Sequence, residues 1–468
     1  RPEAQQLPDA ATLHVNRTHY YQQVLHGYYQ FDCVVSREKN VIRSTKFYIP
    51  EGSIYNQPTV ILALPENTEP WDFLVNSGWK ALADYYGLYM VMMEPKEDKT
   101  WGDLQEELDY FDAVSGDLNL RPMFCSFQAN FYGVGYGKGA DLLGYQARRA
   151  PRSYAALALL GSSGMTAEEK DFCEQTETRV EGVHCSEVQW PVWLTFASMN
   201  TDTERMVQYY RRANHSQESG ETTGTLTTYL PERGGTVDEE WCAKTIVDLD
   251  EWQNTINVDY SKRILTTLFD GIYRYPGTNN GALRYAENIY SRGFHKFTAP
   301  VWGGYFEDKT DTYMREWYVY FPNSAPKSKM PAVFIFHGAG GSGDEIADRI
   351  GWGKVADQYG LLLIMGTASP DNTVREVSDI RTNNILRAWW NSGKPTDERP
   401  DDLMFVDYLY QWLIENYDVD RSRIYASGQS SGGAMSWSCA AWRPDYFAAV
   451  APFSCYRMEL GAWEKHLP

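Results

Sequence analysis

The sequence predicts an α/β fold with two tandem copies of a mostly parallel sheet flanked by helices. Short apolar runs of strand length alternate with helix-compatible segments, which is the pattern of a parallel sheet covered on both faces. A series of these segments recurs in the same order in both halves of the chain. In the second half, the segment 428–432 reads G-Q-S-S-G and stands between a strand and a helix-like run. Each copy is therefore expected to contain a tight turn at the edge of its sheet.

The recurrence is clearest around two apolar strands, which begin at Val60 and Val333. The strand at Val333 is followed by Gly351-Trp352 and then by the residue order A-D-Q-Y-G-L. The strand at Val60 is followed by Gly78-Trp79 and A-D-Y-Y-G-L, and every match is separated by 273 residues. Such constant spacing argues against coincidence, so each copy reads as strand, loop, helix, strand.

A second matched block lies further along each half. Residues 131–139 align with residues 424–432 at an offset of 293, and the same offset pairs Pro151 with Pro444. We expect residues 1–26 to form an N-terminal extension, 27–295 the first copy and 296–468 the N-terminal part of the second copy. Because the first copy continues well beyond its matched block, the second copy is expected to be incomplete within this sequence.

Composition narrows the class of protein. With 468 residues, 43% of them hydrophobic and 22% charged, the chain can build two or three sizeable cores. Its formal net charge of −19 disfavours nucleic acid and anionic membranes as partners, since both bind clustered Lys and Arg. No apolar run approaches the ~18 residues of a membrane span, so a soluble protein without a membrane span is expected.

The cysteines and the first residue bear on the cellular compartment. The seven cysteines include no C-x-x-C pair, and only Cys185 has a neighbouring histidine, so no metal site is expected. The sequence begins at Arg1, which suggests that an upstream segment was removed. Sequons at Asn16 and Asn214 and the acidic composition are compatible with a secreted, extracellular protein, in which some cysteines could pair. The odd count leaves one thiol free or paired outside the chain.

Two glycine-rich segments raise the alternative of nucleotide binding. A P-loop around Lys138 is broken at both ends by Tyr132 and Gly139. Residues 338–343 fit G-x-G-x-x-G, but the next strand ends without the acidic residue that a dinucleotide site requires. A His-Gly turn beside a nucleophile turn is instead how an oxyanion hole is built. We therefore favour a hydrolase loop and expect no cofactor.

The G-x-S-x-G segment makes Ser430 the candidate nucleophile. A sharp strand-to-helix turn lifts the serine hydroxyl above the sheet edge, and Gly428 and Gly432 let strand and helix approach without a Cβ clash. The matching position in the first copy is Gly137, within G-Y-G-K-G. The first copy is therefore expected to be degenerate, because serine chemistry is impossible at that position.

Several segments of the second copy stand in a characteristic order. They are His337-Gly338, Gly351-Trp352 with Ala356-Asp357, R-A-W-W at 387–390, D-L-M-F-V at 402–406, V-D-x-x-R-I-Y at 419–425, the turn at 428–432, and 444–452. Together, over about residues 315–455, they resemble the secreted polyhydroxybutyrate-depolymerase-like esterases, a group that includes feruloyl and acetylxylan esterases. The resemblance implies an α/β-hydrolase fold and hydrolysis of an ester through an acyl-enzyme on Ser430.

The resemblance also implies roles for neighbouring residues. The oxyanion would be held by the backbone N–H of Ser431 and by one from Gly338 or Ala339. Many members of the group have Cys where Ala339 stands, but a backbone contact should survive that difference. Trp389 and Trp390 fall where the group lines its substrate cleft, although an aromatic core position is an equal alternative for one of them.

A serine triad also needs an acid and a histidine that follow the nucleophile in the chain. In the first copy we assign the acid position to about Asn200 and the histidine position to Tyr273, whose segment resembles the group's G-G-H-x-W-P-G. The offset of 293 then places the two partners of Ser430 about 63 and 136 positions further on, near 493 and 566. His466 is a poor substitute, and His337 is expected to be structural. A companion polypeptide is therefore expected to supply both groups and to complete the second sheet.

Two functions remain open at this point. The first is a serine ester hydrolase with one active and one degenerate copy, acting on a polyester, plant-derived or small-molecule ester. The alternative is a non-catalytic binding or scaffold protein built from decayed hydrolase copies, since a fold does not guarantee an activity. An Asp near 493 and a G-H-x-W-P-like segment near 566 would distinguish them, and the intact turn at Ser430 favours the enzyme.

Overall fold

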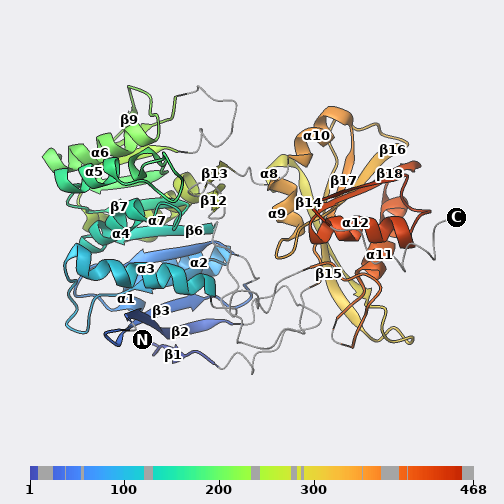
Figure 1. Ribbon diagram of the computed structural model, residues 1–468, viewed down its shortest axis with the longest axis horizontal. Helices are drawn as coiled ribbons and strands as arrows, with labels where there is room; N and C mark the ends of the chain where they lie inside the picture. The colour runs from blue at the N-terminus through green and yellow to red at the C-terminus, as the bar shows by residue number, and fades with distance from the viewer. Residues whose placement is uncertain are drawn as a thin grey trace. The chain divides into compact units, whose positions relative to one another are not determined.

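A computed structural model describes residues 1–8, 25–36, 38–53, 57–120, 130–232, 243–275, 282–285, 289–349, 351–369, 389–397 and 399–455. The described residues up to Tyr285 form one compact unit and those from Ile289 onward form another. Figure 1 colours the first unit from blue to yellow-green and the second from yellow to red. None of the helices in these ranges is both long and apolar enough to cross a membrane.

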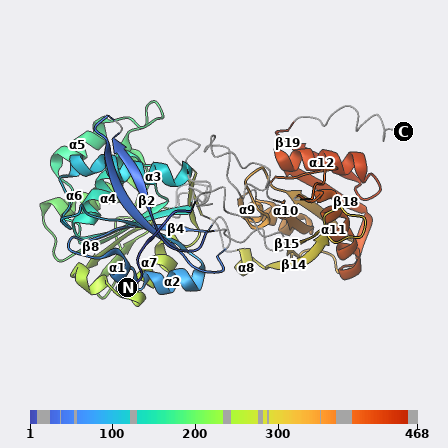
Figure 2. The same ribbon diagram turned by 90° about the horizontal axis from the view of Figure 1, so that it is seen from below.

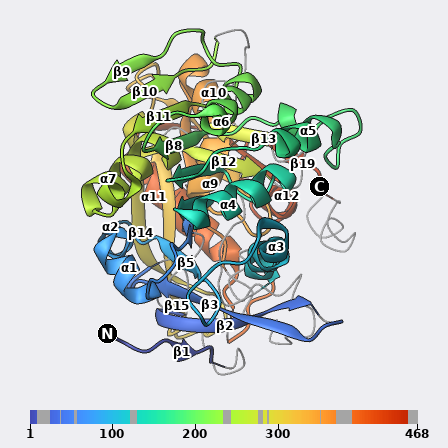
Figure 3. The ribbon, with the colours of Figure 1, turned by 90° about the vertical axis from the view of Figure 1, so that its left-hand side faces the viewer.

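The first unit is built on an eleven-stranded sheet with the order β1-β2-β3-β5-β4-β6-β7-β8-β11-β10-β9. Figure 3 shows β1 towards one end of this sheet and β9 at the other. The strands are β1 (Gln5–Gln6), β2 (Gly27–Ser36), β3 (Val41–Ile49), β4 (Thr59–Ala63), β5 (Tyr89–Met93), β6 (Phe131–Tyr136), β7 (Ala156–Leu160), β8 (Val192–Phe196), β9 (Glu221–Thr223), β10 (Leu226–Tyr229) and β11 (Thr245–Leu249). A separate two-stranded sheet joins β12 (Ile272–Tyr275) to β13 (Ala282–Tyr285).

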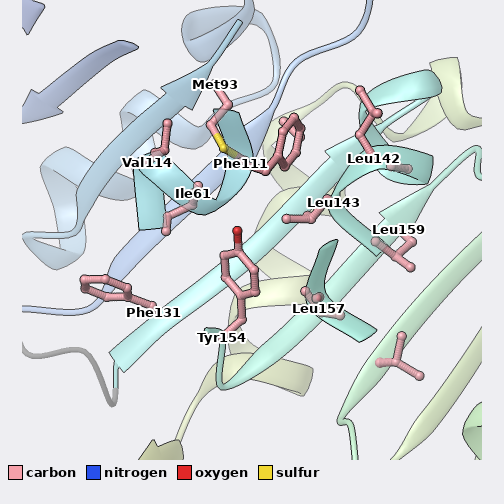
Figure 4. Packing of buried hydrophobic residues seen from close by; sticks show 14 of the residues in the cluster. Ile61, Met93, Phe111, Val114, Phe131, Leu142, Leu143, Tyr154, Leu157 and Leu159 are labelled. Carbon is pink, nitrogen blue, oxygen red and sulfur yellow. The ribbon is translucent and has the colours of Figure 1, made fainter. Parts of the chain in front are cut away.

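Helices cover both faces of the first sheet, as the alternation of apolar runs predicted (Figure 2). On one face lie α3 (Leu104–Leu120), α4 (Lys138–Arg149), α5 (Ala167–Gln175) and α6 (Thr201–Ala213); on the other lie α1 (Pro70–Asn76), α2 (Trp79–Tyr86) and α7 (Val258–Ile264). Figure 4 shows the core on the first of these faces, to which Phe111 of α3, Leu142 of α4 and Ile61 of β4 contribute. The central strands are buried throughout.

The second unit has a six-stranded sheet with the order β14-β15-β17-β16-β18-β19. Its strands are β14 (Phe294–Trp302), β15 (Thr312–Tyr320), β16 (Met330–Phe336), β17 (Leu362–Gly366), β18 (Val419–Gln429) and β19 (Ala449–Phe453). Its helices are α8 (Ile289–Arg292), α9 (Gly343–Arg349), α10 (Trp352–Tyr359), α11 (Asp402–Asn416) and α12 (Ser431–Trp442). The core residues of α11 and α12 cluster on one face of the sheet, and those of α9 and α10 on the other. Both units are thus mostly parallel α/β sheets flanked by helices, as predicted.

The six strands of the second sheet have the same order as β2-β3-β5-β4-β6-β7 in the first. Their pairing registers also correspond. Val60 lies opposite Met90, and Val333 lies opposite Leu363. One strand further along the sheet, the partner of Val60 is Tyr132 and the partner of Val333 is Tyr425. The offsets of 273 and 293 found in the sequence are therefore the offsets between residues in matching positions of the two sheets.

The repeated glycines explain where the repeated helices begin and end. Gly78 precedes α2 with φ of 79°, and Gly351 precedes α10 with φ of 66°. Gly87 and Gly360 close the same two helices, again with positive φ. A residue with a Cβ rarely adopts this left-handed conformation, so glycine at both ends defines each helix within the loop.

The two sheets differ beyond their shared strands. In the first unit β7 is buried and pairs with β8 on its outer side. In the described part of the second unit, β19 pairs only with β18, and its residues are exposed or half-buried. Phe453 at its end is 56% exposed. The apolar strand β19 is therefore an open edge in the described structure.

Candidate active site

Ser430 lies in the tight turn between β18 and α12, at the carboxyl ends of the parallel strands. Its backbone has φ of 53° and ψ of −116°, a conformation that costs a residue with a Cβ about 1–3 kcal/mol. The backbone N–H of Ser430 donates a 2.8 Å hydrogen bond to the carbonyl oxygen of Phe453, and the residue is exposed. The turn thus presents a strained serine at the edge of the sheet, as a nucleophile elbow does.

The flanking glycines are required by close backbone contacts. A Cβ added to Gly432 would lie 2.0 Å from the carbonyl oxygen of Phe336, at the end of β16. A Cβ added to Gly428 would lie 2.4 Å from the carbonyl oxygen of Gly432. Strand, turn and helix therefore pack together at distances that only glycine permits.

The His-Gly turn after β16 lies against this serine turn. A Cβ built on Gly338 would lie 3.8 Å from the Cβ of Ser430 and 3.6 Å from the carbonyl oxygen of Gln429. The turn is closed by a 3.1 Å hydrogen bond from the N–H of Gly341 to the carbonyl oxygen of Gly338. Gly338 and the next residue, Ala339, are half-buried beside the serine. The structure thus brings together the segments that the sequence assigned to the nucleophile and the oxyanion donors.

His337 is held in one tautomer and is not free to act as a base. Its Nε2 accepts a 2.9 Å hydrogen bond from the backbone N–H of Ala368, so its proton lies on Nδ1, which donates at 2.7 Å to the carbonyl oxygen of Gly338. The ring is buried, and burial lowers the pKa of His337 to about 4. A neutral ring with both nitrogens engaged has the structural role expected from the sequence.

The two adjacent tryptophans have different environments. Trp390 is 8% exposed, and its ring packs edge-on against Phe336. Its indole N–H donates to the carbonyl oxygen of His337 at 2.9 Å, and its backbone N–H donates to Oγ of Ser431 at 2.9 Å. Trp390 therefore fastens the His-Gly turn to the start of α12. The buried ring suits the aromatic core position that the sequence left as the alternative for one of the two tryptophans.

Trp389, by contrast, is 43% exposed. The guanidinium carbon of Arg399 lies 4.9 Å from the ring centroid of Trp389, and Arg399 also donates to the Trp389 carbonyl oxygen at 2.9 Å. The backbone N–H of Trp389 donates to Ser369 at 3.1 Å. An anchored and exposed indole can contact a ligand, and the substrate-cleft role of Trp389 stays a prediction.

Sequence reasoning missed a buried ion pair behind this region. A guanidinium nitrogen of Arg315 lies 2.6 Å from Oδ1 of Asp402, and both side chains are at most 1% exposed. The other carboxylate oxygen, Oδ2, accepts a 2.8 Å hydrogen bond from the backbone N–H of Asn391. A signal was present, because the first unit pairs Arg43 with Glu107 at matching strand and helix positions.

The matching turn of the first unit has the same backbone and no nucleophile. Gly137 has φ of 56° and ψ of −127°, and its N–H donates to the carbonyl oxygen of Leu160 at 2.8 Å. A Cβ added to Gly137 would lie 3.4 Å from Cζ2 of Trp252. Trp252 follows β11 and is half-buried. An indole ring therefore covers the position that Ser430 occupies in the second unit.

The expected counterpart of the triad histidine in the first unit is wrong. Tyr273 lies on β12. The carbonyl oxygen of the preceding Ile272 accepts a hydrogen bond from the Tyr132 hydroxyl, and the guanidinium of the following Arg274 donates to the Tyr154 carbonyl oxygen. Tyr132 is the second residue of β6, and Tyr154 lies just before β7, so both are at the end of these strands opposite Gly137. The order of strands instead brings the loop after β11, with Trp252, to the turn.

Asn200 begins α6 as its N-terminal cap and accepts hydrogen bonds from the N–H groups of Asp202 and Thr203. The sequon at Asn214 does not support glycosylation in the folded protein, because the side chain is fully buried. Its Oδ1 accepts a hydrogen bond from the Trp190 N–H, and its Nδ2 donates to the Trp190 carbonyl oxygen. Asn16 and His466 lie outside the described residues.

Comparison with known proteins identifies relatives of part of the chain. Residues 282–459 match the acetyl xylan esterase family, AXE1. The chain is 31% identical over 137 residues to feruloyl esterase B of Talaromyces funiculosus, which covers 29% of this chain and 35% of that protein. It is 27% identical over 143 residues to the poly(3-hydroxybutyrate) depolymerase of Ralstonia pickettii, which covers 28% of this chain and 27% of that protein.

A solved structure, the acetyl xylan esterase from Aspergillus awamori, aligns with 33% of this chain and 50% of its own at 19% identity and a TM-score of 0.25. The chain spans about a third of the length of the curated relatives it matches. The predicted resemblance to feruloyl, acetylxylan and polyhydroxybutyrate-depolymerase-like esterases is thus confirmed, and residues 282–459 carry the family match.

Proposed function

We propose that the second unit carries the nucleophile of a serine hydrolase that cleaves carboxylic esters. Oγ of Ser430 attacks the ester carbonyl carbon, the alcohol leaves with a proton, and water then releases the acid from the acyl-enzyme. The observation that carries the proposal is the strained, exposed backbone of Ser430 at the turn between β18 and α12. The family match of residues 282–459 supports the same chemistry.

The oxyanion of the tetrahedral intermediate would lie between two backbone donors. One is the N–H of Ser431, in the first turn of α12, where the helix dipole favours negative charge. The other is the N–H of Gly338 or Ala339. Its support is that a Cβ built on Gly338 would lie 3.8 Å from the Cβ of Ser430. Removal of one such donor in a serine hydrolase lowers kcat by about 100- to 1,000-fold.

The acid and the base of the triad would come from a companion polypeptide or from residues outside this sequence. Among the described residues of the second unit, His337 is fully hydrogen-bonded and His295 lies on the far edge strand β14. The apolar edge of β19 supports the addition of further strands, since β7 in the first unit is covered there by β8. In the first unit, Trp252 in the loop after β11 lies against the turn at Gly137, so an equivalent loop could bring a side chain to Ser430.

The first unit would be a duplicated, non-catalytic copy of the second. Matching strand order, matching registers and the shared backbone of Gly137 and Ser430 support duplication. Glycine in place of the nucleophile supports loss of activity. The substrate of the whole protein would be a plant-derived, polyester or small-molecule ester, and its setting extracellular, as the names of the relatives and the acidic composition suggest.

Hydrolysis of p-nitrophenyl acetate by the full-length protein tests the proposal. Ser430→Ala should abolish turnover. Ser436→Ala is the matched control, because Ser436 lies on the same helix with its hydroxyl buried against the Gly432 carbonyl oxygen. Turnover that survives in Ser430→Ala would reject Ser430 as the nucleophile. An inactive wild-type protein would favour the scaffold alternative.

A further inference from the structure

A continuous set of hydrogen bonds connects the buried Arg315–Asp402 pair to both segments of the active-site turn. Asp402 begins α11, and its Oδ2 accepts from the N–H of Asn391 at 2.8 Å. The carbonyl oxygen of Asn391 in turn accepts a hydrogen bond from the N–H of Asp402 at 2.7 Å. The position of the chain at Asn391 is therefore fixed from both sides of its backbone by one residue.

The residue before Asn391 extends this set to the site. Trp390 donates through its backbone N–H to Oγ of Ser431 and through its indole N–H to the carbonyl oxygen of His337. The first of these acceptors belongs to the residue after the nucleophile. The second directly precedes Gly338. Trp390 thus spans the two backbone segments whose N–H groups would hold an oxyanion.

A second branch reaches the same turn from Arg315. The Arg315 guanidinium donates to the carbonyl oxygen of Thr367 at 3.1 Å. The next residue, Ala368, donates its N–H to Nε2 of His337. The His-Gly turn is therefore held by Trp390 on its carbonyl and by Ala368 on its ring, and both contacts lead back to the ion pair.

The first unit has a corresponding ion pair and indole contact, although the backbone N–H of Trp101 donates to the Glu66 carboxylate and not to the helix after the turn. Arg43 pairs with Glu107, and the other oxygen of Glu107 accepts the N–H of Gly102 at 2.7 Å. The residue before it, Trp101, donates its indole N–H to the carbonyl oxygen of Leu64 at 2.8 Å, as Trp390 does to His337. A buried ion pair is weak evidence of stabilisation, because desolvation opposes the attraction between the charges. Its presence at matching positions in both units indicates a geometric role.

The geometry assigns Arg315 and Asp402 as positioning residues that set the distance between the two oxyanion donors through Asn391 and Trp390. This inference rests on the proposed function. Neither side chain touches the ester. Hydrogen-bond donors stabilise an oxyanion only when they are fixed at its position before the reaction. A shift of Trp390 would move the Ser431 and Gly338 segments apart and would weaken the transition state more than substrate binding.

The test is steady-state hydrolysis by full-length variants, with active sites counted by a fluorophosphonate burst. Asp402→Asn should lower kcat per titrated site by about 10- to 100-fold with little change in KM. Asp402→Glu should restore most of it, because Glu107 has the same role in the first unit. If Asp402→Asn does not fold, Ser431→Ala is the variant to measure. It removes the hydroxyl that accepts the Trp390 N–H without leaving a buried charge, and it should lower kcat per titrated site in the same way.

Glu107→Gln is the matched control, since it breaks the equivalent pair in the unit without a nucleophile. It should leave kcat per titrated site unchanged. A merely structural role for Asp402 predicts fewer titratable sites with normal kcat per site, and that result would overturn the inference alone. A wild-type protein that neither labels nor hydrolyses would overturn the proposed function, and the positioning role with it.

Discussion

The indole ring of Trp252 lies against Gly137, the residue that matches Ser430, at 3.4 Å from the position of an added Cβ. The ring can lie in this position only because residue 161 is glycine, since a Cβ there would be 2.3 Å from Cδ1 of Trp252. The turn at Gly137 therefore has the backbone conformation of the turn at Ser430, and the indole ring fills the space above it. This relationship separates the two units chemically although their sheets correspond.

Restoring a hydroxyl in the first unit should not restore reactivity. In a Ser430→Ala background, Gly137→Ser places a side chain beside Trp252 in a conformation that costs about 1–3 kcal/mol. The variant should be less stable to urea by about that amount and should not react with a fluorophosphonate. Labelling of this double variant at the rate of the wild-type protein would show that the first turn is still competent.

The glycine after the candidate nucleophile should be intolerant of any side chain. Gly432→Ala places a methyl group 2.0 Å from a backbone oxygen of β16 and should destabilise the second unit by about 1–3 kcal/mol. Gly116→Ala is the control, because nothing lies within 4 Å of a Cβ there and alanine favours the helix by about 0.5–1 kcal/mol. Urea denaturation measures both. Equal unfolding midpoints for the two variants would contradict the close packing of turn and strand.

Trp390→Phe should show how much the indole hydrogen bond of Trp390 contributes to stability, apart from the packing of its ring. Phenylalanine keeps most of the contact with Phe336 but cannot donate to the His337 carbonyl oxygen, so a loss of about 1 kcal/mol is expected. Trp389→Phe, at an exposed ring, should change the free energy of unfolding by less than about 0.5 kcal/mol. A larger loss in the free energy of unfolding for Trp389→Phe than for Trp390→Phe, measured by equilibrium denaturation, would contradict this assignment.

Acid should destabilise the second unit partly through His337. The folded pKa of His337 is about 4, below its ordinary 6.5, because burial disfavours the charged ring. The unfolded chain therefore takes up a proton first as pH falls, and stability present above pH 6.5 is lost between 6.5 and about 4. The loss is about 3 kcal/mol. His337→Gln should be less stable at pH 7.5 but should show a correspondingly smaller fall, and parallel curves for the two proteins would refute this origin.

The turn and the strands around it could be predicted because their determinants are local. The apolar runs at Val60 and Val333 need burial on both faces of a sheet, and Gly428 and Gly432 mark a close backbone approach. Ser430 has the required backbone for the same local reason. The internal repeat then fixed which positions correspond, and the sheet registers agree with both offsets.

Features that depend on long-range contacts were missed. Nothing in the local sequence shows that Trp390 is buried while Trp389 is exposed, because that difference arises from Phe336 at the end of β16 and from His337 after it. The short motif around Tyr273 predicts the wrong end of the sheet, because a local motif does not contain the order of the strands. The Arg315–Asp402 pair joins residues 87 positions apart, and only comparison with Arg43 and Glu107 could have suggested it.

Ser430 is proposed as the nucleophile of an ester hydrolase. The most direct measurement is reaction of the full-length native protein with a fluorophosphonate, followed by peptide mass spectrometry. We expect a single phosphonylated residue, Ser430, with no adduct in Ser430→Ala and an unchanged adduct in Ser436→Ala. An adduct on a different serine, or ester hydrolysis with Ser430 unmodified, would contradict it.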